Sequence, residues 1–208
     1  NINFSKATDN YNIRASYSNL DIKGMIPTSK LKRNMLTLNA SMDLNSHFTF
    51  STNINYVTQN TDGNFDQAYS NATTGSFNQW FHRDLDMNIM RELQYLTNTD
   101  GTLASWNHGN PSATSNNATI LKGNYWYNPY SFQNNKINKA HRDRLYGNMA
   151  LTYKVNNDLS VKLTYRKAQN TTYNEGITTT LLEKSATQTG EKASYGVSQT
   201  NWNKQNIE

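Results

Sequence analysis

The chain has 208 residues, a formal net charge of +5 and no cysteine, and 35% of its residues are hydrophobic while 12% are aromatic. With a mean hydropathy of -0.85, a soluble domain would struggle to fill a core, and the lack of cysteine excludes disulfides. No apolar run approaches the roughly 20 residues of a transmembrane helix, which excludes helical membrane spanning. No recognised nucleic-acid-binding motif accompanies the positive charge, so nucleic acid is not an expected partner.

Segments that alternate apolar and polar residues recur along the chain. In segment 47–57, Phe50 and Ile54 fall on one face of a strand, whereas Ser51 and Asn53 fall on the other. Such alternation fits a half-buried soluble sheet, and it also fits a wall between lipid and a watery lumen. The strands predicted in this way are 2–6, 11–18, 34–44, 47–57, 145–155, 159–166 and, with a less regular alternation, 195–207.

The connections alternate in length. Residues 8–10, 45–46 and 156–158 are rich in Asn, Asp and Ser and predict tight hairpin turns. Between them come the longer segments 20–33, 58–141 and 169–194. Tight turns at one end and long loops at the other are typical of outer-membrane barrels, and compact soluble domains rarely carry so long a loop between neighbouring strands. We therefore predict an all-β fold of antiparallel up-and-down strands that form part of a large transmembrane β-barrel, with a soluble sandwich as the alternative.

The longest connection has its own organisation. Residues 76–95 depart from the period of two and predict a short helix, and Asp100-Gly101 predicts a turn. Aromatic side chains are concentrated in the same loop, where they can stack on sugar rings or pack against peptides. The alternative is a small core that holds the loop in shape. The candidate substrate or partner contacts are Trp80, Trp106, Tyr125, Trp126, Tyr127 and Tyr130.

Basic residues gather on the polar side of the predicted strands. If the tight turns are periplasmic, these residues lie near the extracellular ends of their strands. They form either a solvated rim or a basic lumen mouth that pairs with acidic plug residues or attracts anionic substrate groups. The candidates are Arg33, Arg142, Arg144 and Arg166.

Aromatic residues on the apolar side fall at two levels. Tyr11, Phe48 and Tyr153 lie near the tight turns, and Tyr17, Tyr56 and Tyr165 lie near the long loops. Two such belts are what the two interfaces of a membrane would select. The ordinary preference of β-strands for aromatic residues is the alternative.

The sequence offers no catalytic constellation. His47, His82, His108 and His141 have no metal-ligand spacing, and there is no phosphate-binding glycine loop or nucleophile elbow. We therefore expect no catalytic residue, no metal site and no cofactor.

Several short motifs follow one another in a recognisable order. Ser16-Tyr17-Ser18, Gly24-Met25-Ile26-Pro27 and Arg33-Asn34 come first, and Asp100-Gly101, Asn128-Pro129-Tyr130 and the pair Arg142 and Arg144 follow. In order and spacing, residues 2–166 resemble part of the barrel of the SusC/RagA family of TonB-linked outer-membrane transporters.

This resemblance implies a partial TonB-dependent-receptor barrel over 1–208, with about seven strands and a loop insertion at 58–141, and a plug domain and TonB-contact segment outside these residues. It implies import of an oligosaccharide or peptide across the outer membrane of a Gram-negative bacterium, with a SusD-like surface lipoprotein, the TonB complex and outer-membrane lipid as partners. The alternatives are a passive porin-type barrel and a soluble β-rich glycan-binding or adhesion module.

Overall fold

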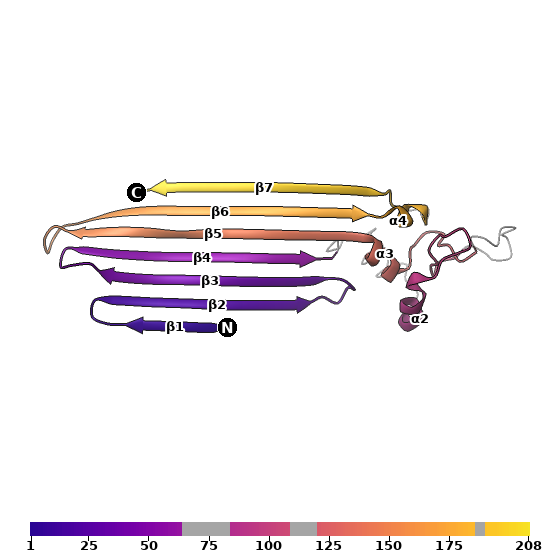
Figure 1. The fold of residues 1–208 in the computed structure, drawn as a ribbon, viewed down its shortest axis with the longest axis horizontal. Coiled ribbons are helices and arrows are strands. Elements are labelled where there is room, and N and C mark those ends of the chain that lie inside the picture. Colours follow the sequence, from indigo (N-terminus) through magenta and orange to yellow (C-terminus); the bar gives the residue numbers. More distant parts are fainter. Residues whose placement is uncertain (64–83, 109–119, 186–189) are drawn as a thin grey trace.

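The computed structural model describes residues 1–63, 84–108, 120–185 and 190–208. They form one antiparallel sheet of seven strands in which every strand pairs with its neighbours in the sequence, from β1 to β7 (Figure 1). The predicted all-β, up-and-down arrangement is confirmed. The strands are β1 Ile2–Ala7, β2 Tyr11–Lys23, β3 Lys30–Asp43, β4 Phe48–Asp62, β5 Lys136–Lys154, β6 Ser160–Thr178 and β7 Ser194–Ile207.

The register keeps the alternating apolar positions in the central parts of β2 to β6 on one face. Ala15 pairs with Leu38, Leu38 with Ile54, and Ile54 with Gly147. Because side chains at successive positions point to opposite faces, this register separates an apolar face from a polar face over these central parts. Nearer the loop end the separation is incomplete, and Met35 and Val57 fall on the polar face.

The apolar face is not covered by a second layer of the described chain. In Figure 1 the helices lie beyond one end of the sheet and leave both of its faces open. Leu36 on β3 and Leu163 on β6 are accordingly 51% and 57% exposed. A long row of exposed aliphatic side chains is unusual for a soluble surface.

Tight connections gather at one end of the strands, which we call the turn end. The predicted turns at 8–10, 45–46 and 156–158 lie there, and in Figure 1 they step progressively further along the strand direction from β1–β2 to β5–β6. In the first turn, for example, the backbone N–H of Thr8 donates to Tyr11 O at 2.7 Å.

Connections at the opposite end, the loop end, are shorter than the sequence predicted. The strands continue until the connections are only 24–29, 63–135 and 179–193, so the predicted limits 20–33, 58–141 and 169–194 were wrong. In these extensions polar residues occupy both faces, as at Thr171 and Thr172 on β6, and on β2 the apolar residues Leu20 and Ile22 fall on the side of Arg14 and Ser16. The apolar band therefore ends before the backbone pairing does.

Short helices occupy the loop end. They are α2 Met87–Glu92, the 3-10 helix η1 Leu93–Tyr95, α3 Pro129–Asn135 and α4 Thr180–Lys184. The helix predicted within 76–95 is found as α2 and η1, and residues 76–83 lie outside the described residues. The first residues of α2, α3 and α4 are capped by side-chain oxygens of Asp86, Asn128 and Thr179, which accept from backbone N–H groups of the first turn.

The only cluster of buried apolar side chains in the described residues lies among these helices, away from the sheet. It consists of Tyr127, Phe132 and Leu182. A search of the described residues for a helix long and apolar enough to cross a membrane found none.

Candidate functional site

A row of amides crosses the polar face at mid-height. The register aligns Asn39, Asn53 and Asn148 in neighbouring strands, with Arg14 at one side of the row and Arg166 at the other. Amide side chains can donate and accept together, so such a row presents a hydrated, uncharged surface between two cations.

Hydrogen bonds link this row to the next one. The Thr37 hydroxyl donates to Asn55 Oδ1 at 2.9 Å, and Asn55 Nδ2 donates to Asn53 Oδ1 at 2.9 Å. Asn53 Nδ2 in turn donates to Asn39 Oδ1. The side chains of β3 and β4 are therefore held in one connected arrangement on the polar face.

Every arginine of the seven strands lies on the polar face. Its cations are Arg14, Arg33, Lys136, Arg142, Arg144, Lys154, Lys162, Arg166 and Lys204, and its carboxylates, counting Glu208 directly after β7, are Asp43 and Glu208. The polar face therefore carries a net positive charge, which favours anionic groups near it.

Two of the predicted arginines lie toward the loop end and are held by neighbours. Arg142 Nε donates to Asn170 Oδ1 at 2.7 Å, and the guanidinium of Arg144 lies 4.8 Å from the ring centroid of Tyr146. Arg33, near the start of β3, pairs with Gln59 on β4, and Gln59 pairs with Arg142 on β5. The three residues therefore lie in one register row, that is, a line of paired residues across the strands. These three arginines form a basic band across β3, β4 and β5.

Arg166 does not belong to that band. The sequence placed it at the end of a strand, but β6 continues to Thr178, so that placement was wrong. Arg166 instead lies in the amide row, where its Nη1 is 2.6 Å from Glu208 Oε2. Around this pair the polar face is hollowed to a volume of about 510 Å³, lined among others by Tyr146 and Lys204.

Two connections pack together at the loop end into a unit that we call the cap, comprising 84–108, 120–135, 179–185 and 190–193. The tilted rings of Tyr127 and Phe132 have their centroids 5.7 Å apart, and the Tyr127 hydroxyl donates to Leu182 O at 3.4 Å. Lys136 Nζ, at the start of β5, and Glu191 Oε1, in the β6–β7 connection, form an ion pair of 2.7 Å. The cap therefore joins the β4–β5 and β6–β7 connections.

A polar turn closes one side of the cap. Asp100 accepts from the Thr102 hydroxyl at 2.7 Å and from its backbone N–H at 2.9 Å. These hydrogen bonds hold the pKa of Asp100 below its usual value, and the one from the Thr102 hydroxyl has the largest effect. Gly101 supplies the positive φ of 79° that the predicted turn requires.

The candidate aromatic residues differ in how far they are buried. Tyr127 is buried in the core of the cap, so the alternative of a structural role holds for this residue. Trp106 and Trp126 are half-buried, Tyr130 is half-buried beneath the Arg91 guanidinium, and Tyr125 is exposed. Trp80 lies outside the described residues.

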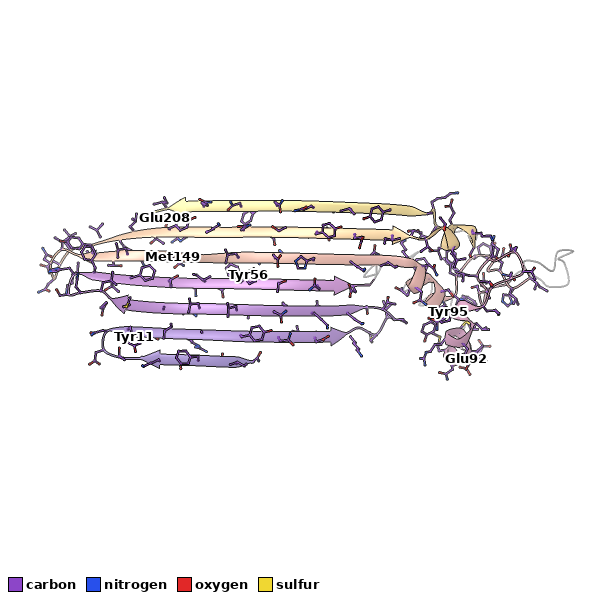
Figure 2. The ribbon with its side chains drawn as sticks, viewed as in Figure 1. Tyr11, Tyr56, Glu92, Tyr95, Met149 and Glu208 are labelled. Carbon is purple, nitrogen blue, oxygen red and sulfur yellow. The ribbon has the colours of Figure 1, made fainter. Side chains whose placement is uncertain are left out.

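The exposed apolar surface of the cap includes residues that sequence reasoning did not select. Ile89 on α2 and Tyr95 on η1 are 49% and 76% exposed, and Figure 2 shows Tyr95 at the end of the molecule opposite Tyr11. Both residues lie on short helices beside the aromatic residues of the loop, and this position in the sequence could have identified them as candidates. Together with Tyr125 they give the cap a discontinuous aromatic and aliphatic outer surface.

On the apolar face, five of the six aromatic side chains lie at the two predicted levels. Tyr165, predicted near the long loops, does not, because β6 continues to Thr178 and Tyr165 pairs with Met149, four residues nearer the turn end than Leu145, the partner of Tyr56. Phe48 and Tyr153 stack near the turn end with ring centroids 4.7 Å apart. Nearer the loop end, the Tyr17 hydroxyl donates to Asn34 Oδ1 at 2.8 Å. These tyrosines thus place their rings among apolar residues and their hydroxyls among polar ones.

Tyr56 on β4 is placed in the same way as Tyr17 on β2. Its hydroxyl donates to Asp143 Oδ1 at 3.2 Å, and His141 Nε2 lies 2.9 Å from Asp143 Oδ2. The ring of His141 also contacts Asn60 Oδ1 at 2.7 Å. Across the part of the chain that the structure describes, no group of three or more metal-ligating side chains comes together.

A scan against known protein families finds no family model that matches this chain, and no curated protein matches it.

Proposed function

We propose that this chain is part of the wall of an outer-membrane β-barrel that imports bulky nutrients. One observation carries the membrane part of this proposal, namely that a band of exposed apolar side chains crosses one face of the sheet from β2 to β6, with no layer of the described chain over it. The basic polar face and the cap support the transport part.

The two limits of the band can be followed from β2 to β6. On β2 the unbroken apolar run extends from Tyr11 to Tyr17, and the register rows of these two residues reach β6 at Leu163 and Gln169. On β6, however, the unbroken run lies four residues nearer the turn end, from Leu159, directly before the strand, to Tyr165. The upper limit stays in one row of paired residues, Tyr17, Leu36, Tyr56 and Leu145, and moves only on β6. The lower limit moves toward the turn end in steps, to Leu44 on β3 and to Val155 on β5.

The shift of the lower limit is of the size that tilted strands produce. From Tyr11 on β2 to Leu159 beside β6 it amounts to four residues over four strand-to-strand steps, which is about 3.4 Å along the strand for about 4.8 Å across it and corresponds to a tilt of about 35°. Strands of membrane barrels tilt by about 35–45°.

The height of the band is of the expected order. At this tilt the apolar run spans roughly 17 Å on β2 and β6, and roughly 28 Å from Leu145 to Val155 on β5, against an apolar band of about 25 Å in outer-membrane barrels. The tyrosine hydroxyls of Tyr17 and Tyr56 meet polar partners at its upper limit, as rings at a membrane interface do.

In this proposal the polar face lines the lumen and the loop end is extracellular. The amide row offers a substrate hydrogen bonds without strong charge, and the basic band of Arg33, Arg142 and Arg144 lies above it toward the cap. The exposed apolar residues of the cap would contact an arriving oligosaccharide or peptide, or a surface lipoprotein that covers the mouth. A plug domain and energy from TonB, in the manner of the SusC/RagA family, follow from the resemblance alone.

A passive porin is the second candidate, since a polar, basic lumen wall also suits an open channel. Planar-bilayer recordings of the full-length protein separate the two. A plugged transporter shows no steady conductance, whereas a porin conducts continuously. A soluble glycan-binding module is the third candidate, and it requires the full-length protein to remain monodisperse without detergent.

Uptake by intact cells tests the transport proposal. Cells that make the full-length protein are given a mixed pool of isotope-labelled oligosaccharides and peptides, and internalised compounds are identified by mass spectrometry. We expect uptake that stops when the inner membrane is de-energised, and that falls when Tyr95→Ala and Tyr125→Ala are combined. Tyr195→Ala, an exposed tyrosine on the apolar-face side of β7, is the matched control. Uptake that persists without energy contradicts active transport.

A further inference from the structure

A hollow interrupts the apolar face in the middle of the band. It has a volume of about 110 Å³ and lies between β4, β5 and β6. Its walls are formed mainly by apolar side chains, those of Ile54, Leu145, Met149 and Tyr165. The hollow opens to the face that would contact lipid if the proposed membrane orientation holds.

Gly147 creates the hollow. It pairs with Ile54 on one side and Lys167 on the other, and it contributes no side chain to the apolar face. A Cβ at this position would lie 2.1 Å from Asn53 O and 2.9 Å from Ile54 Cα. The close approach of β4 therefore excludes any larger residue, and the gap is a fixed feature of the wall.

Lys167 lies beside the hollow and occupies the next position on the apolar face after Tyr165, the last residue of the apolar run on β6. It lines the hollow and is half-buried. The carboxylates of this face in the described strands are Asp21, Asp62, Asp143 and Glu175, and none lies in the register rows of Lys167 or Tyr165. In these strands the ammonium group has no ion-pair partner.

An apolar hollow with a cation at its upper rim matches one kind of ligand. An acyl chain fills an apolar hollow, and an anionic headgroup at the membrane surface neutralises a lysine at that level. We propose that the hollow at Gly147 binds one acyl chain of an anionic phosphate-bearing membrane lipid, whose headgroup is held by Lys167. This inference rests on the proposed membrane orientation.

Photolabelling of the full-length protein in phosphatidylcholine nanodiscs tests the site. Phosphatidylglycerol and phosphatidylcholine carrying the same photoreactive acyl chain are compared, and labelled peptides are mapped by mass spectrometry. We expect phosphatidylglycerol to label 145–149 and 165–167 about fivefold more than phosphatidylcholine, since one basic residue near an anionic headgroup contributes a factor of that order. The excess should be confined to these segments.

Variants assign the preference to its parts. Lys167→Gln should reduce phosphatidylglycerol labelling of these segments to the phosphatidylcholine level. Lys162→Gln, on the polar face of the same strand, should leave the labelling unchanged. Met149→Phe, which fills the hollow from its wall, should lower labelling by both lipids at 145–149 while the rest of the band is labelled as before.

The outcomes separate this site from the membrane proposal. Equal labelling by the two lipids along the whole apolar face means an ordinary lipid annulus, which overturns the lipid site and leaves the membrane orientation intact. No labelling of the apolar face by either lipid overturns the orientation itself, and the lipid site with it.

Discussion

The sheet and the cap of this molecule are built on opposite principles. The cap buries Tyr127, Phe132 and Leu182 in a small core and surrounds them with hydrogen bonds. The sheet has no such core. Many of its aliphatic side chains are exposed, Leu163 to 57%, and its described strands are held together by their ladders and cross-strand contacts.

The contrast shows which solvent each region requires. A unit that hides its apolar side chains is stable in water, whereas a sheet that displays them needs an apolar surrounding or a large partner. Both regions come from one chain, and they meet where α3 leads into β5. A boundary between two solvents would therefore lie across β2 to β6, below the cap.

The largest effect is expected inside the cap. Leu182 has no exposed surface, so Leu182→Ala should destabilise the cap by about 2–5 kcal/mol. Hydrogen exchange in 120–135 and 179–185 should increase strongly, while exchange in β2 to β4 stays the same. Leu96→Ala, at a position 40% exposed, is the control and should cost far less. Equal effects of the two variants would mean that the cap has no specific core.

On the sheet, the same substitution should have opposite consequences on the two faces. Leu151 lies in the band and Thr152 beside it on the polar face. Leu151→Arg should reduce the stability of the barrel in lipid by about 2–4 kcal/mol, and Thr152→Arg by much less. Denaturant titration of the full-length protein in lipid vesicles measures both. Similar losses would contradict the separation of the faces.

A smaller effect is expected at the upper limit of the band. Tyr56→Phe removes the hydrogen bond to Asp143 while it keeps the ring, and should cost about 1 kcal/mol. Combining it with Asp143→Asn in a double-mutant cycle isolates the contribution of the pair. Strict additivity of the two changes would mean that the pair contributes nothing.

The smallest effect concerns the turn at Asp100. Its pKa is lower in the folded protein than in the unfolded chain, so its contribution is complete above the unfolded value of about 3.9 and is lost as the pH falls through the folded value. Cap opening, followed by hydrogen exchange, should therefore increase slightly below pH 4. Asp100→Asn should remove this pH dependence. An unchanged profile would show that the Thr102 hydrogen bonds do not stabilise the cap.

The sequence predicted the strands correctly where apolar and polar residues alternate with a period of two. The central parts of β2 to β6 carry one apolar face each, and this pattern predicted the strands and the face of residues such as Leu38 and Asn39. It failed beyond the band, where Asn19 and Asp21 occupy the positions that carry apolar residues lower on the same strand. There the strand is specified by pairing with its neighbours, which a single sequence does not display.

The cap was less predictable for a related reason. Helices as short as α4 are stabilised by tertiary contacts such as the burial of Leu182, and their own residues carry little signal. The aromatic cluster was visible, but its sequence does not reveal that Tyr127 turns inward while Tyr125 stays outside. That division depends on contact with the β6–β7 connection, which lies far away in the sequence.

The central claim is that one face of this sheet contacts lipid and the other contacts water. Spin labels placed on the full-length protein in lipid vesicles test it directly, because oxygen concentrates in hydrocarbon and water-soluble nickel complexes stay outside it. The apolar set is Leu38, Ile54, Leu151 and Leu163, and the polar set is Asn39, Asn53, Thr152 and Thr164. Labels of the first set should collide mainly with oxygen, and labels of the second mainly with nickel. Indistinguishable behaviour of the two sets would contradict the account.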